Sequence, residues 1–340
     1  MPGRSSRTHW LARLEDAWRR TRERRGIRRG LVAVVIPFAG YGTREEVRVL
    51  GRVVLRRPGA APADRFTKIR GWRSFLSIPV GDADVEVVVG EARRTIRTDR
   101  GGVLDAAIPA HLAPGWTAVR LSIGSDEVEA PVFVVDDGVS FGVVSDVDDT
   151  VMVTALPRRL LAAWNTFVVD EHARRPVPGM AVAYTRLWQE HPGSPVIYLS
   201  TGAWNVAPTL TRFLERNVYP RGALLLTDWG PTHDRWFRSG SEHKRASLAR
   251  LAREFPGVRW LLIGDDGQHD EEIYAEFAAA HPKNVAAIAI RRLTPGQAVL
   301  AGGRSSAPTH GPHGVPWVSA EDGPGMIEEF ERLGLLDSIS

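Results

Sequence analysis

The chain has 340 residues, of which 43% are hydrophobic and 25% charged, so it can bury a substantial core and has room for two domains. It contains no cysteine, which excludes a disulfide framework, a thiolate metal site and a cysteine nucleophile. No stretch approaches the roughly 18 apolar residues of a membrane span, and we expect a cytoplasmic protein.

The formal net charge of +4 belongs to an amino-terminal arm, residues 1–30, which holds ten arginines against three acidic residues. Apolar residues at helical spacing predict a basic amphipathic helix here: Trp10, Leu11, Leu14 and Trp18. Such a helix either makes peripheral contact with an anionic membrane or packs its tryptophans on the body of the protein, and both hypotheses stay open. No nucleic acid is expected as a partner, because no recognised binding motif accompanies the arm.

Residues 31–136 carry short alternating apolar runs separated by glycine, proline and aspartate, such as VRVLGRVVL, VEVVVG and TAVRLSI. The pattern predicts an antiparallel β-sandwich domain, with a turn at 98–102 between two strands. The run at 31–40 follows two arginines, as a signal-peptide core would, but its shortness and its β-branched residues favour a buried strand. This domain shows no cluster of metal-ligand spacing, so scaffolding or recognition is its expected role.

From residue 137 to 340, continuous apolar runs alternate with helical patterns. The runs are FGVVS (141–145), VIYLS (196–200), ALLL (223–226), RWLLIG (259–264) and VAAIAI (285–290). Continuous apolar runs are typical of parallel strands that are covered on both faces. The alternation predicts a doubly wound parallel-sheet α/β domain.

Polar side chains follow three of these runs directly. In an open α/β sheet the ligand binds beyond the carboxyl ends of the strands. The side chains expected to converge there are Asp146, Asp148, Asp149, Thr150, Ser200, Thr201, Asp265, Asp266 and Asp270. Lys244, one of only three lysines in the chain, precedes the fourth strand and is expected to join them.

Several carboxylates at one edge of a sheet repel each other unless a cation compensates. Oxygen ligands without cysteine or a pair of histidines favour Mg²⁺ as the cofactor over zinc. A magnesium ion beside a lysine and a hydroxyl group is what phosphoryl transfer requires. The sequence therefore predicts a metal and phosphate site.

The segments DVDDT, YLS, Lys244 and GDDGQHD resemble the four motifs of the haloacid dehalogenase superfamily of aspartate-nucleophile phosphatases. Within that superfamily, SDVDDTVMVT, VPGM, YLSTGAWN and LIGDDGQHDEEIY resemble the phosphatidate phosphatase catalytic-domain family, whose fungal members associate with actin patches. The resemblance covers about residues 140 to 292. It implies a haloacid dehalogenase-like phosphatase domain over 137–340.

By position, the resemblance implies that Asp146 is the nucleophile and forms an aspartyl phosphate. Asp148 would protonate the leaving oxygen and later deprotonate the attacking water. Lys244 would offset negative charge on the nucleophile and on the phosphoryl group.

The remaining motif residues would bind ligands. Substrate contacts are implied for Thr150, Ser200 and Thr201. Metal ligation is implied for Asp146, Asp148 through its carbonyl, Asp265 and Asp266. Asp270 fits the spacing of a further acidic position.

Several of these residues also have purely structural interpretations. Asp149 fits a turn cap and is given no catalytic role. Thr201 would equally cap a helix, and Lys244 would be an exposed helix residue. His243 and His269 are interpreted as surface groups or substrate contacts rather than as metal ligands.

The interval between Asp146 and Ser200 leaves room for a short helical insertion at 157–169 but not for a large lid domain, which suits a bulky substrate. Together with the basic arm, this favours a magnesium-dependent phosphomonoester hydrolase acting on a phosphorylated lipid, with phosphatidate converted to diacylglycerol and phosphate. The first alternative is the same mechanism on a soluble or protein-bound phosphomonoester. The second is a binding module with a silent α/β domain, which an uncompensated carboxylate cluster disfavours.

Overall fold

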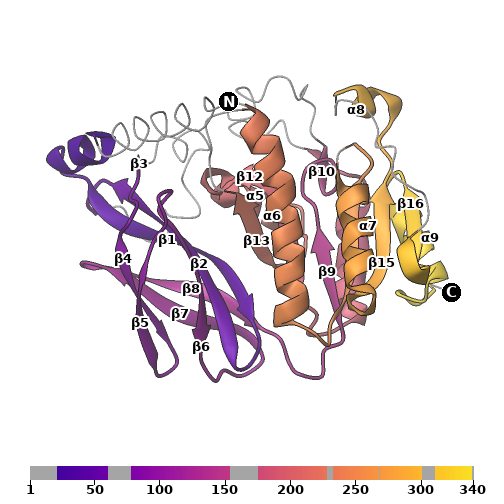
Figure 1. The fold of residues 1–340 in the computed structure, drawn as a ribbon, viewed down its shortest axis with the longest axis horizontal. Helices are drawn as coiled ribbons and strands as arrows, with labels where there is room; N and C mark the ends of the chain where they lie inside the picture. The colour runs from indigo at the N-terminus through magenta and orange to yellow at the C-terminus, as the bar shows by residue number, and fades with distance from the viewer. Residues whose placement is uncertain are drawn as a thin grey trace, which may run out of the picture.

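The computed structural model describes residues 21–59, 78–153, 175–227, 233–267, 269–300 and 311–338. Within these ranges the chain forms two large sheets, with helices around the second, and a short ribbon of β10 (Met152–Val153) and β11 (Arg175–Pro176) (Figure 1). Residues 21–28 are helical, whereas residues 1–20 of the predicted arm and the predicted insertion at 157–169 lie outside the described residues. None of the described helices is long and apolar enough to cross a membrane.

The first sheet has eight strands in the described part of the chain. They are β1 (Val32–Gly42), β2 (Glu46–Arg56), β3 (Ile78–Pro79), β4 (Asp84–Val89), β5 (Ala92–Arg97), β6 (Val103–Pro109), β7 (Gly115–Ile123) and β8 (Asp126–Val134). Their order is β3-β2-β1-β8-β7-β4-β5, and β6 also pairs with β2. The predicted turn at 98–102 is confirmed: it leads from β5 to β6, with Gly102 at a φ of 75°, a conformation that glycine adopts without strain.

The prediction of an antiparallel sandwich is wrong, because these strands form one curled, mixed sheet. β1 and β8 run parallel at their carboxyl ends and so connect the halves that a sandwich would keep separate. Inward residues from both halves share one core, among them Val35, Val49, Val87 and Leu121. Alternating apolar residues indicate that one face of a sheet is buried. The alternation is the same when a second sheet covers that face and when the sheet curls over its own face, so the sequence could not distinguish the two.

The second sheet contains six strands within the described residues. They are β9 (Phe141–Ser145), β12 (Val196–Ala203), β13 (Ala223–Thr227), β14 (Arg259–Asp265), β15 (Val285–Arg291) and β16 (Trp317–Ala320). The order is β13-β12-β9-β14-β15-β16, and all neighbours are parallel. Each of the five predicted apolar runs forms a strand, and β16 is an additional edge strand that was not predicted.

The helices are α4 (Met180–Glu190), α5 (Ala207–Arg216), α6 (His233–Glu254), α7 (Asp270–Ala280), α8 (Pro295–Leu300) and α9 (Gly323–Arg332). In Figure 1, α6 and α7 lie side by side in front of the sheet. Helix α4 packs against α9. Every residue of β13 and β15 is buried, as expected of strands covered on both faces. The sheet is therefore a rigid support whose carboxyl ends meet at one edge.

An ionic cluster joins the first sheet to helix α6. Arg48 of β2 donates from Nη2 to Glu254 Oε1 at 2.7 Å and from Nη1 to Asp105 Oδ1 of β6 at 2.5 Å. Arg250 of α6 also donates to Asp105, at 3.3 Å. The first sheet is thus attached to the carboxyl-terminal part of the helix that carries Lys244.

Candidate active site

Asp146 follows β9 near the centre of the parallel sheet. Ser145 closes that strand beside Ile263 of β14, and the Asp146 N–H donates to the Ile263 carbonyl at 2.8 Å. Asp265 is the last residue of β14. Because β9 and β14 are parallel neighbours, the two carboxylates reach the same edge of the sheet.

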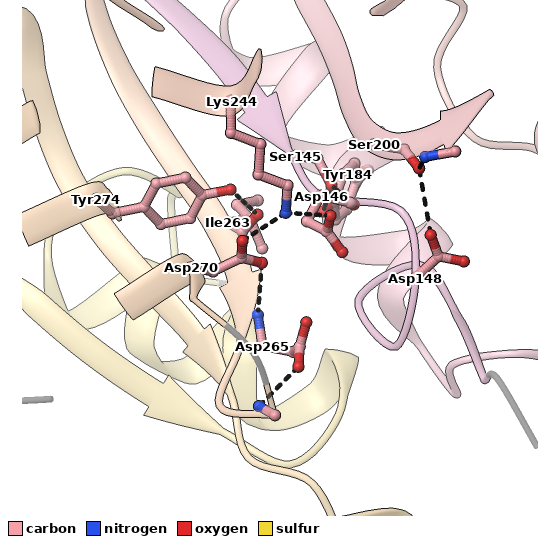
Figure 2. A network of polar contacts seen from close by, with 12 residues as sticks. Ser145, Asp146, Asp148, Tyr184, Ser200, Lys244, Ile263, Asp265, Asp270 and Tyr274 are labelled. Atoms are coloured by element: carbon pink, nitrogen blue, oxygen red, sulfur yellow. Dashed lines mark hydrogen bonds and ion pairs between the residues drawn. The ribbon is translucent and has the colours of Figure 1, made fainter. Parts of the chain in front are cut away.

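Lys244 reaches this edge from helix α6. Its Nζ donates to Asp146 Oδ1 at 2.6 Å and to Asp270 Oδ1 at 2.5 Å (Figure 2). The lysine side chain is only 3% exposed, so both ion pairs are shielded from water. The alternative interpretation of Lys244 as an exposed helix residue is therefore wrong.

Asp146, Asp265 and Asp270 form a compact trio. One carboxylate oxygen from each lies within 4.8 Å of the others, and all three residues are buried. Asp270 also accepts a hydrogen bond from the Asp265 N–H at 3.4 Å. Gly264 makes this close approach possible, since a Cβ at that position would lie 2.7 Å from Asp270 Oδ2.

Burial dominates the ionisation of this cluster. It raises the pKa of Asp146 and of Asp265 well above the ordinary carboxyl value; Lys244 opposes the rise at Asp146, and Asp270 adds to it at Asp265. Burial also acts to lower the pKa of Lys244, but the carboxylates of Asp146 and Asp270 outweigh it and raise that pKa. One ammonium group does not balance three buried carboxylates, so a cation would relieve their repulsion.

The donor atoms fit such a cation. Within the described residues, Asp146 Oδ2 and Asp265 Oδ2 are buried and have no hydrogen-bond partner. Unsatisfied carboxylate oxygens are costly in a protein interior unless they meet a proton, a water or a metal ion. Oxygen-only donors match the preference of hard cations such as Mg²⁺.

Asp148 and Ser200 face each other across the ends of β9 and β12. Ser200 Oγ donates to Asp148 Oδ2 at 3.2 Å and accepts a hydrogen bond from the Gly202 N–H at 3.0 Å (Figure 2). This arrangement places a hydroxyl and a carboxyl group side by side, next to the loop that begins with Asp146.

The loop after Asp148 turns sharply. Asp149 has a φ of 57°, in the left-handed region that aspartate tolerates better than most residues. Arg291 Nη1 of β15 donates to the Asp149 carbonyl at 2.7 Å and fixes the turn. Asp149 is buried in this turn, consistent with the structural role predicted for it, and Thr150 is fully buried behind it.

Two further predicted site residues make hydrogen bonds to groups outside the carboxylate trio. The Thr201 carbonyl accepts a hydrogen bond from Thr227 Oγ1 of β13 at 2.9 Å. Asp266 Oδ1 accepts one from the Leu293 N–H at 2.8 Å and ties the loop after β14 to the segment after β15. Among the described residues, the carboxylate that joins Asp146 and Asp265 is therefore Asp270 rather than Asp266.

Sequence reasoning missed the hydroxyl groups that support the site. Ser145 Oγ donates to the Asp146 carbonyl at 2.6 Å and lies 2.6 Å from the hydroxyl of Tyr184 on α4. Tyr274 of α7 donates to the Ile263 carbonyl at 3.1 Å (Figure 2). A serine that ends an apolar run is a weak signal, and a tyrosine in a helix gives none.

The two histidines beside the motifs have different environments. Burial lowers the pKa of His243 to about 4, while a hydrogen bond to the backbone of Leu225 acts the other way. His243 is thus half-buried beside β13 and is not a fully exposed surface group. His269 is exposed and lies 3.5 Å from Glu272.

Fold and site together define an α/β protein with a buried carboxylate and lysine centre at the carboxyl ends of parallel strands. Residues 141–292 match the family model described as "Phosphatidate phosphatase APP1, catalytic domain". This segment contains Asp146, Ser200, Lys244, Asp265 and Asp270. The predicted resemblance of the chain to the phosphatidate phosphatase family is therefore confirmed.

Two curated proteins of yeasts are similar to part of this chain. An uncharacterized protein of Schizosaccharomyces pombe is 30% identical over 172 residues, which cover 48% of this chain and 26% of that protein. Phosphatidate phosphatase APP1 of Saccharomyces cerevisiae is 26% identical over 153 residues, which cover 44% of this chain and 25% of that protein. The chain thus spans about a quarter of the length of these relatives.

Solved structures add little. A carbohydrate acetylesterase from Xanthomonas citri is 11% identical, with 78% of this chain and 70% of that chain covered and a TM-score of 0.26. A TM-score this low supports no conclusion about fold or function.

Proposed function

We propose that the chain is a phosphomonoester hydrolase that uses Asp146 as its nucleophile and hydrolyses phosphatidate to diacylglycerol and phosphate. The observation that carries the proposal is the buried trio of Asp146, Asp265 and Asp270 around Lys244, within a segment that matches a phosphatidate phosphatase catalytic domain. The name of the Saccharomyces cerevisiae relative supports the choice of phosphatidate as substrate.

In the proposed reaction, Lys244 binds Oδ1 of Asp146, so Oδ2 is the oxygen that attacks phosphorus. A bond forms between Oδ2 and phosphorus, and the bond from phosphorus to the glycerol oxygen breaks. The result is an aspartyl phosphate on Asp146. Lys244 stabilises the negative charge that the attacking carboxylate and the phosphoryl group bring together.

Asp148 is the general acid and base of this proposal. Its proton goes to the glycerol oxygen as diacylglycerol leaves, and Asp148 then takes a proton from the water that attacks the aspartyl phosphate. That second step breaks the bond between phosphorus and Oδ2 and releases inorganic phosphate. The Ser200 hydroxyl, which is 3.2 Å from Asp148 Oδ2, would orient this carboxyl group and contact a phosphate oxygen.

Mg²⁺ is the proposed cofactor, and the carboxylates of Asp146 and Asp265, with Asp270 nearby, would hold it while Oδ2 of Asp146 remains the attacking oxygen. When bound, it would neutralise phosphate oxygens and the carboxylate repulsion described above. Asp266, which was predicted as a ligand, is assigned instead to hold the loop through Leu293.

The strand order, with β12 and β13 on one side of β9 and β14, β15 and β16 on the other, supports a doubly wound domain of the haloacid dehalogenase type. We assign residues 31–136 to a separate β domain, 137–340 to the catalytic domain and 1–30 to the arm. A cytoplasmic enzyme of lipid metabolism would need its arm, or another surface, to reach a membrane-borne substrate.

A substrate comparison tests the proposal. Phosphate release is measured from phosphatidate in mixed micelles and from small phosphate esters, each with and without Mg²⁺. We expect release that requires Mg²⁺ and is faster from phosphatidate. Release from small esters alone would keep the chemistry and favour the alternative, a soluble or protein-bound phosphomonoester. No release from either would overturn the proposal.

A further inference from the structure

A cavity of about 610 Å³ lies between the first sheet and the parallel sheet, and no residue of the carboxylate site lines it. Its size is in the range of small-molecule sites, which often occur where two structural units meet. Most of the wall is apolar, with contributions from Pro37, Phe38, Trp116, Pro131, Leu214 and Leu224. The cavity is thus suited to the hydrocarbon part of a ligand.

A tryptophan and an arginine form the polar end of the cavity. Trp116 of β7 packs on Phe133, with ring centroids 5.2 Å apart, and the Arg221 guanidinium carbon lies 4.1 Å from the centre of the indole. Within the described residues no carboxylate comes within ion-pair distance of Arg221. Burial lowers the pKa of Arg221, with Glu215 acting in the opposite direction. A guanidinium that is stacked and partly desolvated but lacks an ion pair has hydrogen-bond donors available for an anionic ligand.

The backbone that carries Arg221 is strained and held in place. Val218 has a φ of 62°, which is unfavourable for a β-branched residue, and it is 72% exposed. Residues 218–220 are held by three hydrogen bonds from side-chain hydroxyls: Thr185 to the Val218 carbonyl at 3.3 Å, Tyr198 to the Pro220 carbonyl at 2.7 Å, and Tyr219 to the Val151 carbonyl at 2.8 Å. Strain that the surroundings maintain is typical of functional segments.

We propose that this cavity binds an amphiphile with one hydrocarbon chain and a single anionic group, the chain lying on the apolar wall and the anion on Arg221. Glu129 and Glu215 also line the cavity and would repel a second negative charge. The ligand is therefore a monoanion, such as a fatty carboxylate or a phosphodiester lipid with one chain. A phosphomonoester, which is dianionic at neutral pH, is disfavoured, so this site is distinct from the proposed substrate site.

Calorimetric titration of the full chain tests this site without any turnover. The probes are dodecanoate, lauroyl lysophosphatidylglycerol and the uncharged monolauroylglycerol, each below its critical micelle concentration. Dodecanoate carries the carboxylate and the second probe the phosphodiester, so the two anionic sources are compared directly. None of the three is a phosphomonoester, so the result is independent of the proposed phosphatase activity.

Two variants and one control accompany the titration. Arg221→Gln removes the anion-binding charge, and Ala118→Phe fills the cavity from an exposed position of β7, where folding is not at risk. Arg216→Gln, an exposed change on α5 outside the cavity wall, removes the same charge nearby. We expect one anionic probe to bind per chain, about tenfold more weakly in Arg221→Gln, as for a lost charge-assisted hydrogen bond.

We expect Ala118→Phe to lose binding of the anionic probe and Arg216→Gln to bind it within twofold of the wild-type affinity. We expect the wild-type chain to bind the uncharged monolauroylglycerol about tenfold more weakly than the anionic probe. Absence of saturable binding by both anionic probes would overturn the proposal. Binding that Ala118→Phe abolishes but Arg221→Gln leaves unchanged would overturn the assignment of an anionic ligand. Binding that neither variant alters would place the ligand elsewhere on the molecule.

Discussion

Lys244 binds one carboxylate oxygen of Asp146 and leaves the other without a partner among the described residues. An ammonium group in this position lowers the electron density of the bound oxygen and holds the carboxylate in one orientation. In the proposed reaction, the attacking atom is the Asp146 oxygen that Lys244 does not hold. The position of Lys244 on helix α6 determines which of the two oxygens that is. Sequence spacing gives the residue types and cannot give this choice.

Cation binding should stabilise the folded protein. Without a cation, the raised pKa values of Asp146 and Asp265 mean that stability falls as pH rises above the ordinary carboxyl range, because the folded state resists their ionisation. At pH 7.5, Mg²⁺ at 100 times its dissociation constant should stabilise by about 2.7 kcal/mol. Thermal unfolding with and without Mg²⁺ measures this.

Asp265→Asn should remove most of the Mg²⁺ effect on the unfolding temperature, because it removes one of the two unsatisfied oxygens. The matched control is Asp136→Asn, which changes an exposed carboxylate outside the site. An equal Mg²⁺-induced shift in Asp265→Asn and wild type would place the cation at another site.

His243 should make the protein less stable in mild acid. Its pKa is 6.5 in a model compound and about 4 in the folded chain, so between these values the unfolded chain binds a proton that the folded chain does not. Stability from this group is complete above pH 6.5 and is lost as pH falls toward 4, by at most about 3 kcal/mol. Urea unfolding at several pH values should show a smaller pH dependence for His243→Gln, whereas His111→Gln, at an exposed position, should behave as wild type.

Helix α6 links two parts of the molecule. Glu254 and Arg250 near its carboxyl end contact the first sheet, and Lys244 lies ten residues earlier than Glu254, about 15 Å along the axis. The first sheet thereby supports the helix that supplies the ammonium group. This contact gives the first sheet a structural role, one of the two roles, scaffolding or recognition, expected of residues 31–136.

Removing Arg48 should leave Glu254 and Asp105 without their shared cation. The side chains of Arg48 and Glu254 are 16% and 19% exposed, so Arg48→Met should cost about 3 kcal/mol of unfolding free energy, as for a broken buried ion pair. Arg97→Met is the matched control, because Arg97 and Asp84 are 67% and 55% exposed and solvent-exposed ion pairs contribute little to stability. Chemical denaturation that gives equal losses for both variants would contradict this role of the cluster.

The sequence predicted the parallel strands well, because β13 and β15 are buried throughout and therefore appear as continuous apolar runs. The curled first sheet was not predictable, since the β1 and β8 pairing joins residues about ninety positions apart and leaves no local pattern. Strand β16 was not predicted, because it has only four residues and follows a segment rich in glycine, serine and proline.

The site was predicted in part because the parallel strands that carry it could be recognised in the sequence. Asp146 and Asp148 follow β9, Ser200 lies in the second half of β12 and Asp265 ends β14. The topology of a parallel sheet therefore places them together. Asp266 was predicted to ligate the metal with Asp146 and Asp265, but the third carboxylate of the trio is that of Asp270. The turn after β14 directs Asp266 Oδ1 to the Leu293 N–H. Neighbouring acidic residues in a turn point in different directions, and residue type alone cannot tell which one faces the site.

The molecule as a whole places its positive charge at one end of the chain, which would bring it to an anionic membrane. A variant lacking residues 1–20 should bind phosphatidylserine vesicles more weakly, and the wild-type binding should weaken as salt is raised. Co-sedimentation with vesicles measures both effects, with vesicles of uncharged lipid as the control. Unchanged binding after the deletion would favour the alternative in which the arm packs on the protein.

The central claim is that Asp146 becomes covalently phosphorylated. Its most direct test is to quench the Asp148→Asn variant with borohydride during turnover of phosphatidate and Mg²⁺, since this variant lacks the base for the second step. Borohydride reduces an aspartyl phosphate to homoserine, which mass spectrometry of the peptides locates. We predict homoserine at position 146 and none in Asp146→Asn, which should also lose at least about a thousandfold in phosphate release. Homoserine at another aspartate, or full phosphate release by Asp146→Asn, would contradict the account.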